Sequence, residues 1–489
     1  MKEYCRSLII IIFFSFFLIF PVFQAPGITQ DKAAKIDELM NLYHEYGQFN
    51  GTVLVSEGGK VIYKRGIGLA NVEWNIPNEP DTKFRLASIT KQFAAMLIMQ
   101  LVERGKIDLN GKITDYLPDY RKDTGDKVTI HHLLTHTSGI PNYEQEFWAD
   151  KSRDPLTIEQ MVADFCIGNL EFEPGSTHRY SNTGYYLLGV IIEKVTGKPL
   201  DQVLRENILE PTGMTNSGLD TDGLVLENRA TGYTRNIDGL TEAAYMYIDN
   251  AYAAGGMYST VEDLYLWDKA LYTEKLLSKK YKKIMFKPFL NNYAYGWGIR
   301  KVQIGDTEDS TLTIGHDGGI MGFSTRILRL VEDKHLIAIL SNTVGLGTAS
   351  VRDITNNIIS ILYDVPYDLP RKSITEAILK RITEKGVKAG IEMYHEMKEK
   401  HTDVYDFRER ELNTLGYMLL QRDKTEEAIE IFKLNIEVYP EYANGYDSLG
   451  EAYMTKGDRE LAVINYAKSL ELDPNNSNAV RILNRIFEE

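Results

Sequence analysis

The sequence predicts a mixed α/β (α+β) domain followed by an all-helical module, and three patterns lead to this prediction. Strand-like segments near residues 51–66 and 311–342 alternate or cluster apolar residues between Gly-rich and charged turns. Apolar residues at helical spacing dominate the interval between them. From about residue 370 the pattern is helical throughout. We therefore expect a sheet built from both ends of the first domain, a helical insertion between them, and a helical module at the C-terminus.

The individual elements follow in chain order. Residues 33–47 carry apolar side chains at helical spacing and precede two β-branched runs that meet at Gly58-Gly59. Two adjacent glycines accept the positive φ angles of a tight hairpin turn. Further along, QFAAMLIMQLVERG and GYYLLGVIIEKVTG each end near a Gly suited to a helix C-terminus. These segments predict a helix, a hairpin and then two long helices.

Length and composition limit the possible classes of protein. The chain has 489 residues, 43% of them hydrophobic and 25% charged, as is usual for globular proteins of more than one domain. A net charge of -14 disfavours binding to nucleic acid through a general electrostatic surface. We expect a catalytic domain over residues 31–365 and a helical module over residues 374–489.

The N-terminus resembles an export signal. Lys2 and Arg6 precede an apolar stretch over residues 8–20, which is shorter than the roughly 20 residues of a membrane-spanning helix. Residues 1–25 are therefore predicted to be a signal peptide, or an N-terminal anchor if Phe23 prevents cleavage. In both cases the body of the protein is exported, to the periplasm or the extracellular space. Membrane contact is expected only if this segment is retained.

The C-terminal module contains an internal repeat of 34 residues. The repeat places small residues, prolines and apolar residues at matching positions: Gly416 and Gly450, Ala428 and Ala462, Pro440 and Pro474, Leu415 and Leu449, Phe432 and Tyr466. This pattern resembles the tetratricopeptide repeat, and the alternative is two unrelated amphipathic hairpins. Two repeats cannot bury a core alone, so residues 374–408 are expected to add a helix pair and residues 477–489 a capping helix. The repeats would bind a protein partner.

Ser88 and Lys91 form the first candidate catalytic motif. A Ser and a Lys three residues apart share one face of a helix, so the amine can contact the hydroxyl. A free serine is a weak nucleophile that requires a neighbouring base, and a desolvated lysine can serve as one. The motif is short and occurs by chance in chains of this length.

Tyr180 and Asn182 form the second motif, and they follow a turn and precede a helix. A phenol can transfer a proton, and an amide can hold a substrate. The alternative is a helix cap with a packed tyrosine.

His316, Gly318 and Gly319 form the third motif, at the end of a predicted strand. Glycines at a strand edge allow a substrate backbone to approach closely. The N–H group of Gly319 could form an oxyanion hole with that of Ser88. The alternative is a Gly-rich turn with a surface histidine.

The order and spacing of these motifs, Ser88-x-x-Lys91, Tyr180-x-Asn182 and His316-x-Gly318, resemble the active site of the serine β-lactamase and DD-peptidase (penicillin-binding protein) superfamily. The resemblance is nearest to its class C and low-molecular-weight penicillin-binding branch, and it covers roughly residues 33–365. The phrases FRLASITKQF, HHLLTHTSGIP and AAGGMYST also look like this family.

This resemblance implies a five-stranded antiparallel sheet flanked by helices, with a helical lobe and the active site between them. It also implies that Ser88 attacks an acyl carbon and that Lys91 and Tyr180 share the acid and base roles. Asn182 and the third motif would position the substrate. No metal or organic cofactor is needed, and we also set aside a metal site at the histidines of HHLLTHTSG because they have no carboxylate or Cys partner at ligand spacing.

One departure affects the expected substrate. Many relatives have Lys-Thr-Gly where this chain has His316-Asp317-Gly318, so a permanent cation is replaced by a group that titrates near pH 6.5. Recognition of a substrate carboxylate is therefore in doubt, and the substrate could be a peptide, an amide, an ester or a β-lactam. The rival hypothesis is a catalytically weak protein that acts as a binding or scaffold module through its repeats.

Overall fold

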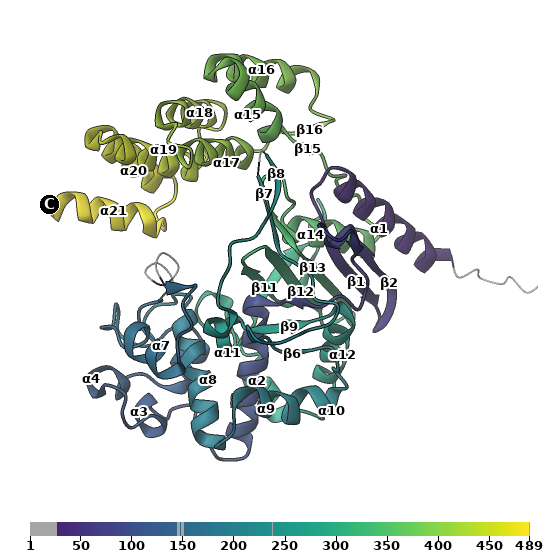
Figure 1. Ribbon diagram of the computed structural model, residues 1–489, viewed down its shortest axis with the longest axis vertical. Helices are drawn as coiled ribbons and strands as arrows, with labels where there is room; N and C mark the ends of the chain where they lie inside the picture. Colours follow the sequence, from purple (N-terminus) through teal and green to yellow (C-terminus); the bar gives the residue numbers. More distant parts are fainter. Residues whose placement is uncertain (1–26, 144–146, 148–150, 237, 489) are drawn as a thin grey trace, which may run out of the picture.

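The computed structural model describes residues 27–143, 147, 151–236 and 238–488, and these form a sheet-containing domain followed by a helical module (Figure 1). The predicted signal or anchor at residues 1–25 lies outside the described residues. Among the helices that are described, none combines the length and the apolar character needed to cross a membrane.

The central sheet is antiparallel and has the strand order β10-β11-β12-β13-β1-β2. Its strands are β1 (Gly51–Glu57), β2 (Lys60–Ile67), β10 (Gly298–Gln303), β11 (Ser310–Ile320), β12 (Phe323–Leu330) and β13 (His335–Ser341). Pairing of β1 with β13, with Val53 opposite Ile339, joins the two ends of the domain as predicted. The β1–β2 hairpin turns at Gly58 and Gly59, whose φ angles are 57° and 78°.

The expected count of five strands is wrong by one, because β10 adds an edge strand. Its residues Arg300, Lys301 and Gln303 are exposed, and polar side chains are usual on an edge strand. A strand of this composition lacks the apolar alternation from which the other five were predicted.

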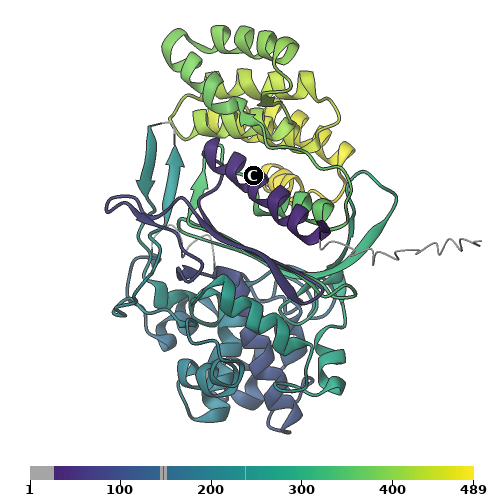
Figure 2. The same ribbon diagram turned by 90° about the vertical axis from the view of Figure 1, so that its right-hand side faces the viewer.

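Helices cover both faces of the sheet (Figure 2). Helices α1 (Gly27–Glu45) and α14 (Val351–Leu362) pack on one face, where Ile36, Ile339 and Ile358 share a buried core. The larger core on the other face includes α2 (Thr90–Glu103), α8 (Asn182–Thr196) and α12 (Val261–Leu271). The predicted helix GYYLLGVIIEKVTG corresponds to α8, which ends at Gly197 with a φ of 67°. Ser88 and Lys91, at the start of α2, lie on this second side of the sheet.

The remaining elements of the helical lobe are short. They are α3 (Ile113–Tyr116), α4 (Lys122–Gly125), α5 (Ile130–Leu134), α7 (Ile158–Phe165), α9 (Leu200–Leu204), α10 (Glu210–Thr212), α11 (Tyr252–Gly255) and α13 (Lys279–Met285). Small ladders join the lobe to the sheet domain: β3 (Leu69–Asn71) with β4 (Ile76–Pro77), β5 (Phe84–Arg85) with β9 (Met257–Ser259) and β6 (Gly218–Leu219), and β14 (Thr343–Gly345) with β7 (Tyr233–Asn236) and β8 (Gly239–Glu242).

The C-terminal module stacks helical hairpins. Its helices are α15 (Ile374–Lys385), α16 (Val387–Lys400), α17 (Glu409–Leu420), α18 (Thr425–Val438), α19 (Ala443–Lys456), α20 (Arg459–Leu472) and α21 (Ser477–Glu488). The 34-residue spacing has a packing cause. A Cβ atom on Gly416 would lie 2.3 Å from the ring of Phe432, and a Cβ atom on Gly450 would lie 3.2 Å from Tyr466. Each repeat therefore pairs a glycine with an aromatic ring where its two helices cross.

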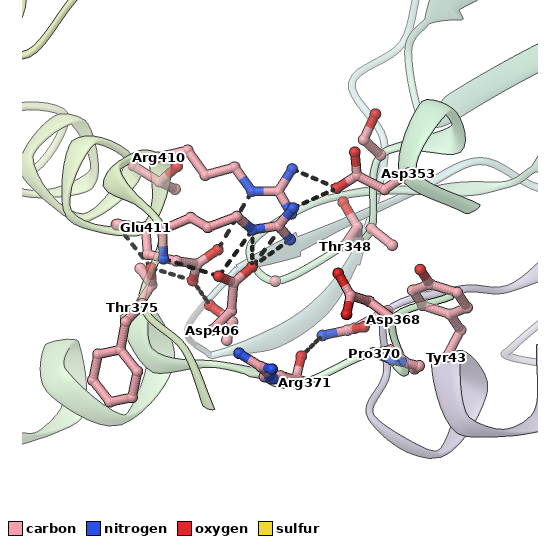
Figure 3. Close-up of a pocket in the computed structure, with 18 of the residues that line it drawn as sticks. Tyr43, Thr348, Asp353, Asp368, Pro370, Arg371, Thr375, Asp406, Arg410 and Glu411 are labelled. Carbon is pink, nitrogen blue, oxygen red and sulfur yellow. Dashed lines mark hydrogen bonds and ion pairs between the residues drawn. The ribbon is translucent and has the colours of Figure 1, made fainter. Parts of the chain in front are cut away.

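Ion pairs join the module to the sheet domain around a polar cavity of about 770 Å³. Arg410 Nη1 lies 2.7 Å from Asp353 Oδ2 on α14 (Figure 3), and Arg408 Nη1 lies 3.4 Å from the same oxygen. Within the module, Arg408 also forms an ion pair with Asp406. Burial raises the pKa of Asp406, but the hydrogen bonds from Arg408 outweigh it and hold this pKa below the usual carboxyl value. The module is thus docked on α14, which also contacts β12 and β13 of the central sheet.

Candidate active site

Ser88 lies on a tight turn at the entrance of α2. The turn, η1 (Ala87–Ile89), leads directly into the helix, and Ala87 has a φ of 49°, which is unfavourable for a residue other than glycine. Backbone strain of this kind persists only where the surrounding structure enforces it, and it concentrates at functional sites. The turn places half-buried Ser88 in the wall of a cleft of about 730 Å³.

Lys91 contacts Ser88 from a fully buried position. Its Nζ atom lies 3.1 Å from Ser88 Oγ, 2.6 Å from Asn182 Oδ1 and 2.7 Å from the carbonyl oxygen of Ala254. The oxygens of Asn182 and Ala254 can only accept hydrogen bonds. Ser88 is the one partner of the three that can also donate, so the same geometry allows Lys91 to donate to the hydroxyl or, when neutral, to take its proton.

Tyr180 and Asn182 come from the start of α8. Ser181 caps this helix through a hydrogen bond from the N–H of Gly184, so the cap that was weighed as an alternative is present together with the contacts of the motif. The Tyr180 ring lies with its centroid 4.9 Å from Lys91 Nζ. Asn182 reaches the same amine, so the first two motifs meet at Lys91.

The third motif lies on β11 against the turn that carries Ser88. A Cβ atom on Gly318 would lie 2.1 Å from the carbonyl oxygen of Leu86, next to the hydrogen bond of 2.8 Å that Thr325 Oγ1 donates to that oxygen. Gly318 is thus required by the close approach of two protein backbones, and not by the substrate as the sequence suggested. Gly319, in contrast, has no atom within 4 Å of the position of a Cβ, is exposed, and lines the cleft.

His316 is held as a neutral imidazole. Its Nδ1 lies 2.6 Å from the carbonyl oxygen of Asp317 and must donate to it, so Nε2 accepts from the Tyr293 hydroxyl at 2.9 Å. Burial, followed by the nearby charge of Lys91, lowers the pKa of His316 to about 4. The expectation that this group titrates near pH 6.5 is therefore wrong, because it took no account of burial. At neutral pH His316 contributes no positive charge to the cleft.

Positive charge in the cleft comes from other residues. Its lining includes Arg300, Lys301, Arg326 and Arg352, with Asp317 as the single carboxylate. Asp317 forms ion pairs with Arg326 and Arg352. Burial raises the pKa of the Asp317 carboxyl group, but the two arginines outweigh burial, so this pKa is lowered. In a protein of net charge -14, this cleft is locally cationic.

Three further residues contribute to the site and are not among the three predicted motifs. Ala254 supplies only a backbone carbonyl, although it lies in the quoted phrase AAGGMYST. Tyr293 lines the cleft, and its hydroxyl bonds to His316. His136, from HHLLTHTSG, accepts a hydrogen bond of 3.1 Å from the N–H of Ser181, and its ring centroid lies 4.3 Å from that of Tyr180.

Two other residues near these motifs have packing roles. Trp297 is fully buried. Asn342 is also fully buried, and it bonds to the carbonyl oxygens of Leu69 and Thr231 away from Ser88. In the part of the chain that is described, no three His, Cys, Asp or Glu side chains are grouped so that they could hold a metal ion.

Comparison with known proteins gives matches to two families. The family model described as Beta-lactamase matches residues 33–358, and the one described as Tetratricopeptide repeat matches residues 443–476. The chain is 32% identical over 379 residues to a penicillin-binding protein of Bacillus subtilis (strain 168). This alignment covers 72% of this chain and 82% of that protein.

Solved structures with this fold include the octameric penicillin-binding protein homologue from Pyrococcus abyssi, with 29% identity, a TM-score of 0.60, and coverage of 71% of this chain and 81% of that one. They also include the D-amino acid amidase from Ochrobactrum anthropi SV3, with 25% identity, a TM-score of 0.59, and coverage of 68% and 99%. The chain thus belongs to the beta-lactamase family and carries a tetratricopeptide repeat near its C-terminus.

Proposed function

We propose that this protein is a serine hydrolase that acts through an acyl-enzyme. Ser88 Oγ attacks the acyl carbon, and its proton passes to Lys91 or Tyr180. The same pair then protonates the leaving amine or alcohol as the acyl bond breaks. Water next attacks the acyl-enzyme and releases Ser88. The N–H groups of Ser88 and Gly319 are proposed to hold the oxyanion.

The observation that carries this proposal is the position of the Lys91 amine. It is fully buried and lies 3.1 Å from Ser88 Oγ, between two oxygens that only accept. A buried amine without such partners would be costly, so its retention beside a hydroxyl favours a catalytic role. A scaffold protein would have no use for this arrangement.

The charge of the cleft supports an acyl donor that carries a carboxylate. Arg300 is exposed and lines the same cleft as Ser88, and no described side chain forms a hydrogen bond or an ion pair with its guanidinium. Guanidinium groups bind carboxylates through paired hydrogen bonds. We propose that Arg300 takes the role that His316, being neutral, cannot fill. The names of the relatives, penicillin-binding protein and D-amino acid amidase, favour a peptide or amide with a D-amino acid.

The test compares substrates that differ only in a carboxylate. We expect kcat/KM for a D-alanyl-D-alanine peptide to exceed that for its C-terminal amide by about tenfold or more, since a charge-assisted hydrogen bond contributes about 1.5–3 kcal/mol. The Arg300→Gln variant should lose this preference and keep its rate on the amide. Equal rates on both peptides in the unsubstituted protein would exclude recognition of a carboxylate and favour an esterase or aminopeptidase. Hydrolysis of β-lactams is a secondary expectation.

We further propose export of the chain and binding of a protein partner by the repeats. The first follows from residues 1–25, and the second from the stacked helices α17 to α21, since such repeats commonly present a concave binding surface. Pull-down with the repeat surface substituted, compared with the unsubstituted protein, tests the second proposal.

A further inference from the structure

The face of β11 that points away from Ser88 carries a cluster of arginines. Side chains alternate along a strand, so Gly318 faces the nucleophile turn while Asp317 points to the opposite face. There Asp317 lies opposite Arg326 of β12, and their side chains form an ion pair. Arg352 of α14 reaches the same carboxylate, with Nε 2.5 Å from Oδ2. Arg300, on the neighbouring strand, lines the same cleft.

The hydrogen-bonding capacity of this cluster is only partly used. The side chain of Arg326 is 12% exposed, and its Nε atom is buried without a hydrogen-bond partner among the described residues. Arg352 uses its Nε on Asp317, and its two terminal nitrogens have no partner in the same part of the chain. The buried, unfilled Nε donor of Arg326 is costly, and an oxyanion ligand would satisfy it and also use the free donors of Arg352.

The charges of the cluster are also unbalanced. Three guanidinium groups face one carboxylate. Burial lowers the pKa of Arg326, and the carboxylate of Asp317 raises it. The positive charges of Arg352 and Arg300 lower this pKa further, because they repel the charged form of Arg326. The excess of positive charge in the cleft favours an anionic ligand, and no described side chain supplies a second carboxylate there.

We propose that Arg326 and Arg352 form a subsite for a second acidic group of the acyl substrate, a carboxylate or a phosphate, in addition to the carboxylate that Arg300 is proposed to bind. The inference rests on the proposed function only in naming the substrate as the source of this group. The cluster and Ser88 line one cleft of about 730 Å³, so a single substrate can reach both.

The open edge of β11 provides a path between the two positions. Pairing of β10 with β11 ends at Gly298 opposite Gly315, so His316–Ile320 has no strand partner on that edge in the described chain. An extended peptide that pairs with this edge would direct alternate side chains to opposite faces of the sheet. One group would lie at Ser88 and a neighbouring one at the arginines. The predicted substrate is therefore an extended, acidic peptide or conjugate.

The first experiment measures binding without catalysis. The full chain with Ser88→Ala is titrated with glutarate and with inorganic phosphate by calorimetry, alone and with Arg326→Gln or Arg352→Gln. We expect saturable binding of at least one anion that weakens about tenfold in each variant, as for loss of a charge-assisted hydrogen bond. Arg65→Gln, which removes an equal charge from an exposed pair on β2, is the control and should not change binding.

The outcomes separate the subsite from the proposed function. Arg352 is 58% exposed, so Arg352→Gln keeps the test valid if the more buried Arg326 variant does not fold. No saturable binding, or binding unaffected by Arg352→Gln, would overturn the subsite whether or not Ser88 is active. A second experiment compares kcat/KM for two ester substrates that differ by a distal carboxylate. If anions bind but the two esters react equally, the site takes a free anion and the assignment to the substrate is wrong.

Discussion

Substitution of Gly318 by Ala tests how closely β11 must approach the nucleophile. The added methyl group would lie 2.1 Å from the carbonyl oxygen of Leu86 and 2.3 Å from Thr325 Oγ1, between the two atoms that now form a hydrogen bond. Ordinary contacts would require a separation well over 3 Å, so β11 must move by about 1 Å or more from the turn that carries Ser88. The strained φ of Ala87 shows that this turn has little freedom to follow.

The expected loss has two parts. Overpacking of a close contact costs about 1–3 kcal/mol of unfolding free energy. A displacement of about 1 Å between Ser88 and the oxyanion donors costs about a hundredfold in rate. We expect Gly318→Ala to lower the midpoint of thermal unfolding and to slow labelling by a fluorophosphonate by about that factor.

Gly319→Ala is the matched control, because the neighbouring position is open. No atom lies within 4 Å of its Cβ position, so this variant should unfold at the same temperature as the unsubstituted protein and react with the small reagent at a similar rate. The explanation is refuted if Gly318→Ala labels at the normal rate, or if the two variants are equally destabilised.

Three further predictions concern the base, the pH dependence and the docking of the repeats. Lys91→Met should retain the fold and lower the acylation rate by about 10²–10⁴, measured by single-turnover kinetics. Because the pKa of His316 is about 4, kcat/KM should show no change near pH 6.5 from this group. In the unfolded chain this histidine titrates at about 6.5, so between pH 6.5 and pH 4 the unfolded state binds more protons than the folded state. The unfolding free energy should therefore fall as the pH drops from 6.5 to 4, and thermal melts measure this change. Combined Arg408→Ala and Arg410→Ala should weaken the docking of the module on α14 and increase proteolysis in residues 365–375 without lowering the acylation rate. Unchanged proteolysis would contradict this account of docking.

Much of the site could be predicted because the chemistry depends on side chains at fixed short spacings. Ser88 and Lys91 meet through one helical turn, and Tyr180 and Asn182 reach the same amine from the start of α8. The sheet was predictable for a related reason, because five of its strands carry apolar patterns with a period that separates strands from helices.

The parts that could not be predicted depend on the tertiary structure. The carbonyl of Ala254 has no side-chain signal, since any residue offers the same group. The neutral state of His316 depends on burial and on Tyr293, 23 residues earlier in the chain. The arginine cluster joins residues of β10, β12 and α14, and only the sheet register brings them together. The edge strand β10 was missed because its exposed polar residues hide the strand pattern.

The measurement that tests the central claim most directly is intact-mass spectrometry of the protein after incubation with a fluorophosphonate and, separately, with a labelled penicillin. The account predicts one covalent fluorophosphonate adduct per chain that is absent from Ser88→Ala, and a penicillin adduct on the same residue if the cationic cleft accepts that carboxylate. A protein that forms no adduct with either reagent, or a Ser88→Ala variant that is still modified, would contradict the assignment of Ser88 as the nucleophile.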